Sequence, residues 1–261
     1  MSLQLCVLAS GSSGNCTYVG SEKTHILIDA GLSGKATTER LVDVGVDPES
    51  IHAICLTHEH DDHKASLHVL HRRYGVSLYS NSGTIEALSR NPKLNTLPWN
   101  VFTTGQPFTI GDLVLEPFRV PHDSYDPVGF VVSCGEVRVG VATDMGMATE
   151  LIRQRLRNCG ALVLESNHDE TMLRESSRPW ALKQRISGRQ GHLSNEKAGS
   201  LIAEVAGDTL RTVFLAHLSR DCNTPDLAMR TVQQVLGREG CSHIDVKMTH
   251  ASRASEITIV E

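Results

Sequence analysis

The stretch Thr57-His58-Glu59-His60-Asp61-Asp62-His63 places three imidazoles and three carboxylates within seven residues. Ionisable groups packed this densely are costly unless a shared partner balances them, and a loop that needs only solubility has no use for them. A divalent metal ion is the simplest shared partner. The stretch therefore predicts a metal centre.

The flanks of this stretch indicate how it is held. Ile51–Leu56 is a short apolar, β-prone run, and Lys64–Tyr74 has apolar residues at helical spacing. The cluster then lies on a turn between a buried strand and a helix. His58 and His60 project to the same side and can bind one ion, whereas Asp62 and His63 reach a second ion close by.

The pattern His-x-His-x-Asp-His resembles the signature of the metallo-β-lactamase fold superfamily. The resemblance implies an α/β protein with a four-layer αββα sandwich, in which Asp29 supports the metal turn without binding metal. Glu59 and Asp61 occupy the variable positions of the pattern, so we expect them to face solvent or to lie behind the ligands.

The composition fits such a layered protein. The 261 residues contain 40% hydrophobic but only 4% aromatic residues, which predicts a core of Leu, Val, Ile and Ala. No Pro/Gly/Ser-rich linker divides the chain, so we expect a single domain over residues 1–261. The net charge of −5 argues against broad non-specific nucleic-acid binding but says nothing about a local patch.

Seven cysteines without a Cys-x-x-Cys pair predict free thiols in a reducing compartment. The sequence shows no signal peptide and no apolar run of roughly 20 residues. We therefore expect a cytoplasmic protein without a membrane partner. The sequence leaves the oligomeric state open.

Alternating strand and helix patterns run along the whole chain. After an initial strand at Leu3–Ala9, the loop Ser10–Asn15 is rich in small residues that can face an anion or the metal centre. The further predicted helices are 33–44, 82–90, 149–158, 195–205 and 225–238, and the further predicted strands are 16–20, 25–30, 76–79, 101–103, 108–110, 113–120, 128–134, 137–141, 161–165, 212–216 and 244–248.

The resemblance implies three more ligands, each after a predicted strand: His122, Asp144 and His217. His58, His60 and His122 would hold the first ion, and Asp62, His63 and His217 the second, with Asp144 shared between them. Without the resemblance, His122 is ordinary surface and Asp144 a turn or cap aspartate. Imidazole and carboxylate ligands without thiolate suit zinc or manganese.

Two further motifs, Glu165-Ser166-Asn167-His168-Asp169 and Gly191-His192-Leu193-Ser194-Asn195, together with the opening loop, resemble the YycJ (WalJ)-like hydrolases. That group is related to the nuclease branches of the superfamily. The resemblance implies that His192 faces the scissile phosphate and that His168 and Ser194 contact substrate. The alternative is structural: Ser194 or Asn195 caps the following helix, and His168 is a cap.

Arg178, Lys183, Arg185 and Arg189 form a basic segment before His192. Such a run is usually a solvated loop, but its position also suits contact between Arg189 and a phosphate backbone.

These residues predict hydrolysis by a hydroxide held between two metal ions, oriented by Asp62 or Asp144. The substrate expected first is DNA or RNA, cut from an end. The alternatives are a small ester, thioester or lactone, as in hydrolases of the glyoxalase II or lactonase type, and a non-catalytic, metal-stabilised regulatory module.

Overall fold

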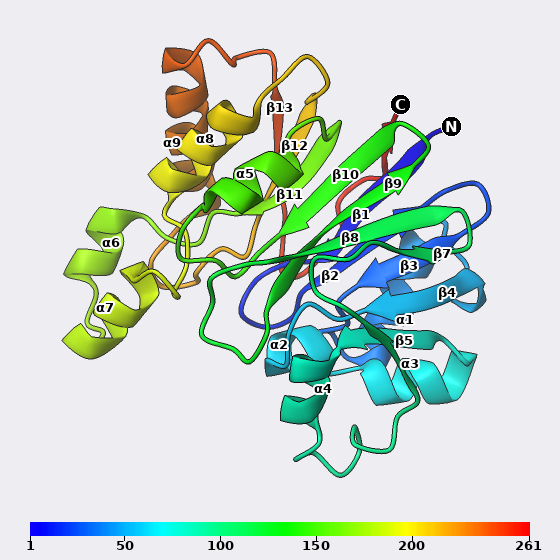
Figure 1. Cartoon of the computed structure of the whole chain (residues 1–261). Coiled ribbons are helices and arrows are strands. Elements are labelled where there is room, and N and C mark those ends of the chain that lie inside the picture. Colours follow the sequence, from blue (N-terminus) through cyan, green and yellow to red (C-terminus); the bar gives the residue numbers. More distant parts are fainter.

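The computed structural model describes residues 1–261 and contains two seven-stranded β-sheets packed face to face (Figure 1). The first sheet has the strand order β14-β1-β2-β3-β4-β5-β6. Its strands are β1 (Leu3–Ala9), β2 (Cys16–Gly20), β3 (His25–Ile28), β4 (Ile51–Cys55), β5 (Ser77–Asn81), β6 (Trp99–Phe102) and β14 (Thr258–Val260). The last strand of the chain thus pairs with the first, antiparallel, with Leu3 opposite Val260.

The second sheet has the order β13-β12-β11-β10-β9-β8-β7. Its strands are β7 (Phe108–Ile110), β8 (Leu113–Arg119), β9 (Val128–Cys134), β10 (Val137–Ala142), β11 (Ala161–Glu165), β12 (Thr212–Ala216) and β13 (Asp245–Met248). In each sheet an antiparallel part adjoins a parallel part, which comprises β3 to β6 in the first sheet and β10 to β13 in the second.

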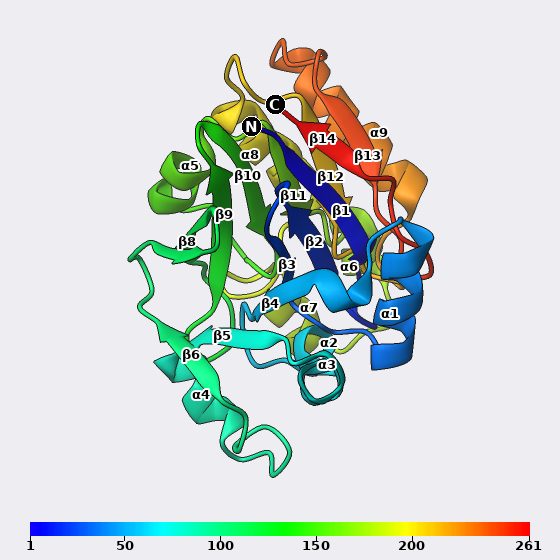
Figure 2. The same cartoon turned by 90° about the vertical axis from the view of Figure 1, so that its right-hand side faces the viewer.

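Helices cover the outer faces of both sheets (Figures 1 and 2). On the first sheet lie α1 (Gly34–Asp43), α2 (Asp61–Lys64), α3 (Leu67–Tyr74) and α4 (Ser82–Leu88), with a short 3-10 turn η1 (Pro48–Ser50). On the second lie α5 (Glu150–Leu156), α8 (Asn195–Val205) and α9 (Pro225–Arg238), and α6 (Glu170–Glu175) and α7 (Trp180–Ser187) stand to one side. The predicted four-layer αββα sandwich is confirmed.

Each of the three layer contacts has its own apolar core. Between the sheets, Leu5, Val7, Phe130 and Phe214 are fully buried or nearly so, and burying one such side chain stabilises the fold by roughly 1.5–3 kcal/mol. A second cluster joins the second sheet to α5, α8 and α9, and a third joins the first sheet to α1, α3 and α4. As the composition predicts, aliphatic residues dominate all three.

Most predicted elements are confirmed to within a few residues, but four expectations were wrong. The basic segment predicted as a solvated loop is largely the helix α7, preceded by the unpredicted helix α6. The strand β14 was missed. The helix expected from Lys64 to Tyr74 is broken after Lys64, and the four-residue helix α2, which begins earlier at Asp61, carries Asp62 and His63. No helix is both long enough and apolar enough to span a bilayer.

The parallel strands position the functional residues. β4, β8, β10 and β12 end at the same edge of the sandwich, and the predicted ligands lie in the segments that follow them: His58, His60, Asp62 and His63 after β4, His122 after β8, Asp144 after β10 and His217 after β12. Carboxyl ends of parallel strands gather side chains from distant parts of a chain in this way. The chemistry therefore lies at this edge.

Candidate metal centre

The turn that carries the histidine cluster is anchored by Asp29, a buried residue directly after β3. Its Oδ1 accepts hydrogen bonds from the backbone N–H (2.8 Å) and the hydroxyl (3.0 Å) of Thr57, and its Oδ2 lies 2.7 Å from Nδ1 of His63. Gly31 lets the turn approach, since a Cβ there would stand 1.6 Å from the carbonyl oxygen of Asp62. Asp29 supports the turn as the resemblance implies.

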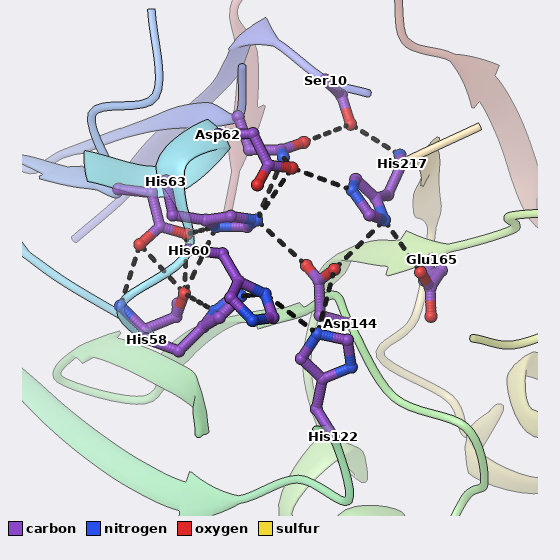
Figure 3. A network of polar contacts seen from close by, with 12 residues as sticks. Ser10, His58, His60, Asp62, His63, His122, Asp144, Glu165 and His217 are labelled. Atoms are coloured by element: carbon purple, nitrogen blue, oxygen red, sulfur yellow. Dashed lines mark hydrogen bonds and ion pairs between the residues drawn. The ribbon is translucent and has the colours of Figure 1, made fainter. Parts of the chain in front are cut away.

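Three histidines converge on one side of the centre (Figure 3). Nδ1 of His60 lies 3.0 Å from Nε2 of His58 and 3.3 Å from Nε2 of His122. Behind these nitrogens, Nδ1 of His58 contacts the hydroxyl of Thr57 at 2.9 Å, and Nδ1 of His122 lies 3.2 Å from the carbonyl oxygen of Gly191. Three ring nitrogens this close together suit one cation.

Asp62, His63 and His217 converge on the other side. Oδ2 of Asp62 lies 3.6 Å from Nε2 of His63 and 3.4 Å from Nε2 of His217. The opening loop supports this side through two side chains: Asn15 donates to Oδ2 of Asp62 (3.2 Å), and the hydroxyl of Ser10 accepts from the backbone N–H of His217 (2.6 Å). The loop therefore faces the centre, as its composition predicts.

Asp144 lies between the two groups, and Figure 3 shows its carboxylate pointing at both. Oδ2 is 3.2 Å from Nε2 of His63, and Oδ1 is 3.3 Å from Nδ1 of His217 and 3.9 Å from Nε2 of His122. Oδ2 is buried without a well-aligned hydrogen-bond partner. A buried carboxylate oxygen left unpaired is costly, and a cation there would satisfy it. The donor set fits divalent metal.

The backbone of the centre is held in an uncommon conformation. Four residues other than glycine have positive φ, and three of them are Asp29 (64°), Asp144 (56°) and His217 (56°). The left-handed conformation costs an L-residue roughly 1–2 kcal/mol. The surrounding hydrogen bonds maintain it; for example, Asn167 donates to the carbonyl oxygen of His217 at 2.7 Å. Such strain gathers at functional sites.

Glu165, at the end of β11, is a central residue of the site, although the sequence indicates it only as part of a motif. It is completely buried, and its Oε1 lies 2.7 Å from Nδ1 of His192 and 2.9 Å from Nδ1 of His217. Its Oε2 accepts from the backbone N–H groups of Met145 (3.0 Å) and Leu193 (3.1 Å). Burial alone would raise the pKa of Glu165, but His192 and the hydrogen bonds lower it to about 2. Glu165 is therefore a carboxylate that orients both rings.

The histidines of the two sides have opposite electrostatics. Burial and the neighbouring histidines lower the pKa of His58 and of His60. Burial would also lower the pKa of His63, but Asp29 and Asp144 raise it to about 10. Asp144 and Asp62 likewise hold the pKa of His217 well above its usual range despite burial. Burial thus favours neutral imidazoles at His58 and His60, whereas the buried carboxylates favour charged ones at His63 and His217.

His192 lies beside the centre, with its ring centroid 5.2 Å from those of His122 and His217. It is part of a further cluster with Asp144, Glu165 and His217 whose ligand atoms lie within 4.8 Å of one another. Its side chain keeps 21% exposure, whereas His63 is fully buried. His192 is thus the histidine of this cluster that solvent reaches.

The other predicted substrate residues lie further back. Ser194 is buried and caps α8, accepting from the backbone N–H of Lys197, while its hydroxyl donates to Glu170. His168 is buried and pairs with Ser194 in a short parallel bridge. Arg189 is exposed in the turn that follows α7. The cap expected as the alternative for Ser194 is therefore present.

Comparisons with known proteins agree with this geometry. A family model described as the β-lactamase superfamily domain matches residues 24–218. The exodeoxyribonuclease YycJ of Bacillus anthracis is 37% identical over 243 residues, covering 92% of this chain and 91% of the relative. The exodeoxyribonuclease WalJ of Streptococcus pneumoniae is 36% identical over 235 residues, covering 89% and 87%.

Among solved structures, the metallo-β-lactamase fold protein YhfI from Bacillus subtilis is similar, with a TM-score of 0.74 over 98% of this chain and 99% of that one. The identity is only 16%, so this likeness shows the fold alone.

Proposed function

Because this chain belongs to the β-lactamase superfamily and, within it, to the group of the YycJ and WalJ hydrolases, we propose that it is a two-metal exonuclease acting on DNA. The observation that carries the proposal is the buried carboxylate oxygen of Asp144, which lacks a well-aligned hydrogen bond and lies between two converging sets of ligand atoms. The curated relatives supply the substrate, since both are named exodeoxyribonucleases.

His58, His60 and His122 would hold one ion, Asp62, His63 and His217 the other, and Asp144 both. The absence of thiolate ligands suits zinc or manganese. When bound, a pair of divalent ions supplies a hydroxide at neutral pH and balances the charge that develops on a phosphodiester.

The chain's own residues position the reaction. Asp62 is partly exposed, with a side chain 23% accessible, so its carboxylate can accept a proton from the attacking nucleophile. The buried Asp144 fixes the positions of both ligand sets. Neither residue needs to move, because each is already held by histidine neighbours.

His192 has the geometry of a proton donor to the leaving oxygen. Burial would lower its pKa, but Glu165 raises it. Oε1 of Glu165 lies 2.7 Å from Nδ1 of His192 and keeps the proton on that nitrogen, whereas Nε2 of His192 has no partner within the protein. The protonated ring can therefore donate from Nε2 to an oxygen in the opening of the site.

A DNA substrate and seven unpaired cysteines, six of them buried, favour a cytoplasmic location.

The test is cleavage of end-labelled single- and double-stranded DNA, with manganese or zinc, by the wild type, Asp62→Asn and Asp61→Asn. Asp61 is the matched control, because it is the adjacent aspartate, fully exposed, and paired only with Lys64. We expect stepwise shortening by the wild type and Asp61→Asn, and a loss of at least about 100-fold in Asp62→Asn.

If all three proteins leave DNA intact while the wild type opens thioesters or lactones, the metal centre stands and the DNA proposal falls. Shortening at the wild-type rate by Asp62→Asn would overturn the proposed role of Asp62.

A further inference from the structure

A cavity of about 360 Å³ lies behind the metal centre, lined by α6, α7 and the start of α8. Figure 1 shows α6 and α7 projecting from the body of the sandwich. The polar and aromatic lining residues are His168, Glu170, Arg174, Trp180, Lys183 and Lys197. The metal chemistry described above uses none of them.

The cavity shares its wall with the metal centre. Asn167 holds the carbonyl oxygen of His217, and the next residue, His168, lines the cavity. At the other end of the wall, the backbone N–H of His192 donates to the carbonyl oxygen of Ile186 in α7 at 2.8 Å. The segments Asn167–His168 and Ile186–His192 therefore border both the cavity and the metal centre.

The charges of the lining favour a dianion. Three cations, Arg174, Lys183 and Lys197, face one carboxylate, Glu170, which already accepts a hydrogen bond from Ser194. Arg174 also lies 3.7 Å from Glu175, which is outside the lining, but both side chains of this pair are exposed, so the pair is weak. Among the lining residues the excess is therefore two positive charges. A phosphomonoester carries about −1.5 to −2 at pH 7, whereas an internal phosphodiester carries −1. The balance of charge therefore fits the end of a phosphorylated strand better than its interior.

His168 provides an independent sign of a ligand. Its side chain is 1% exposed, yet its Nδ1 has no hydrogen-bond partner. Burial lowers the pKa of His168 to about 4, so the ring is neutral at pH 7 and adds no charge to the lining. Buried polar atoms without partners are uncommon in native proteins, and a ligand oxygen or a water would satisfy this one.

Trp180 stands at the rim with 68% of its surface exposed. An aromatic ring beside a cationic groove is the usual platform on which a single-stranded base stacks. The rim therefore suits the base that belongs to the terminal phosphate.

We propose that this cavity binds the phosphomonoester at the end of a DNA strand, with Lys183 and Lys197 on the phosphate and Trp180 against the terminal base. This inference rests on the proposed exonuclease function and deepens it. A strand anchored there would pass the partly exposed side chain of His192 to bring an internal phosphodiester to the metals. The strand is then shortened in fixed steps from that end.

The test measures binding independently of cleavage. Three thymidine dinucleotides with a phosphorothioate linkage, which resists hydrolysis, carry a 5′-phosphate, a 3′-phosphate or neither, and quenching of tryptophan fluorescence in the metal-loaded protein reports binding. We expect one phosphorylated probe to bind about tenfold more tightly than the unphosphorylated one. Whether it is the 5′ or the 3′ form identifies the anchored end.

The variants assign the binding to the cavity. Lys183→Ala/Lys197→Ala should lose the preference, and the control Lys35→Ala/Lys93→Ala, which removes the same charge elsewhere, should keep it. Trp180→Phe should lose the quenching, leaving only Trp99. Equal binding of all three probes, or a preference that survives in Lys183→Ala/Lys197→Ala, overturns the inference.

The two proposals fail separately. DNA shortening by the wild type without any preference among the probes sinks the end-binding cavity alone. Selective binding of a phosphorylated probe by a protein that cuts no DNA sinks the exonuclease function alone.

Discussion

The two sides of the metal centre are built differently. On the side of Asp62, both ring nitrogens that point away from the centre meet buried carboxylates: Asp29 behind His63 and Glu165 behind His217. On the three-histidine side, the corresponding nitrogens of His58 and His122 meet only a hydroxyl and a carbonyl oxygen. A carboxylate behind a ligating imidazole makes it a stronger metal ligand.

Because of this difference, we expect the side of Asp62 to bind its metal ion more tightly than the three-histidine side. The carboxylate-backed side also has a carboxylate of its own, Asp62, whereas the other side has only imidazole rings besides Asp144. We expect the two ions to differ in affinity by about 10–100-fold.

Asp144→Asn should have the largest effect, because it removes the one anion shared by both sides. Two dications about 3.5–4 Å apart repel each other strongly unless an anion lies between them. We expect activity to fall by about 10³-fold or more, and the metal content after dialysis to fall from two ions per chain toward one. Metal analysis and cleavage rates measure the two effects.

The control for this change is Asp126→Asn, which removes a carboxylate paired with Arg119 outside the centre. It should keep both ions. An Asp144→Asn protein that retains two ions at full affinity would show that the carboxylate is not shared.

Glu165→Gln should affect the carboxylate-backed side alone. The amide keeps the shape but loses the charge that holds His217 and His192 through their Nδ1 atoms. Loss of such a partner typically costs 10–100-fold in metal affinity or activity. We expect the tighter ion to weaken by that factor and the weaker ion to change little, as measured by competition with a chromophoric chelator.

A folding defect must be excluded for this variant, because Glu165 also accepts two backbone hydrogen bonds, from Met145 and Leu193. Thermal unfolding of the metal-free protein gives that control. Equal weakening of both ions would remove the distinction between the sides.

The sequence predicts best those residues of the site that lie close together along the chain or that directly follow an apolar strand. The proposed ligands on the turn are close together in sequence, so their spacing alone indicates metal binding. Asp144 and His217 could be assigned because each follows an apolar strand, where the resemblance requires a ligand. Glu165 also follows such a strand, Ala161–Glu165, so the signal was present. Its role was missed because it acts through other side chains, and spacing in sequence does not reveal such contacts.

Two errors in the predicted elements have identifiable physical causes. The helix α7 starts after Pro179 without a side-chain cap and has a single buried residue, Ile186, so neither a start signal nor an apolar face marks it. The strand β14 has three residues, and its partner β1 lies at the opposite end of the chain. Its position depends on a long-range pairing that local sequence patterns do not encode.

Thr57→Val should have the smallest effect, and it tests the three-histidine side. The hydroxyl contacts Nδ1 of His58 at 2.9 Å and both carboxylate oxygens of Asp29, whereas the backbone N–H of Thr57 keeps its own bond to Asp29. Removing one neutral hydrogen-bonding group in a buried site costs about 1–3 kcal/mol of folding free energy.

Because no charge is lost, the weaker ion should lose only a few-fold in affinity, less than the tighter ion loses in Glu165→Gln. Chelator competition and thermal unfolding measure both quantities in the same samples. A loss as large as that of Glu165→Gln would mean that a hydroxyl supports its histidine as strongly as a buried carboxylate does, and the two sides of the centre would then be equivalent despite their different construction.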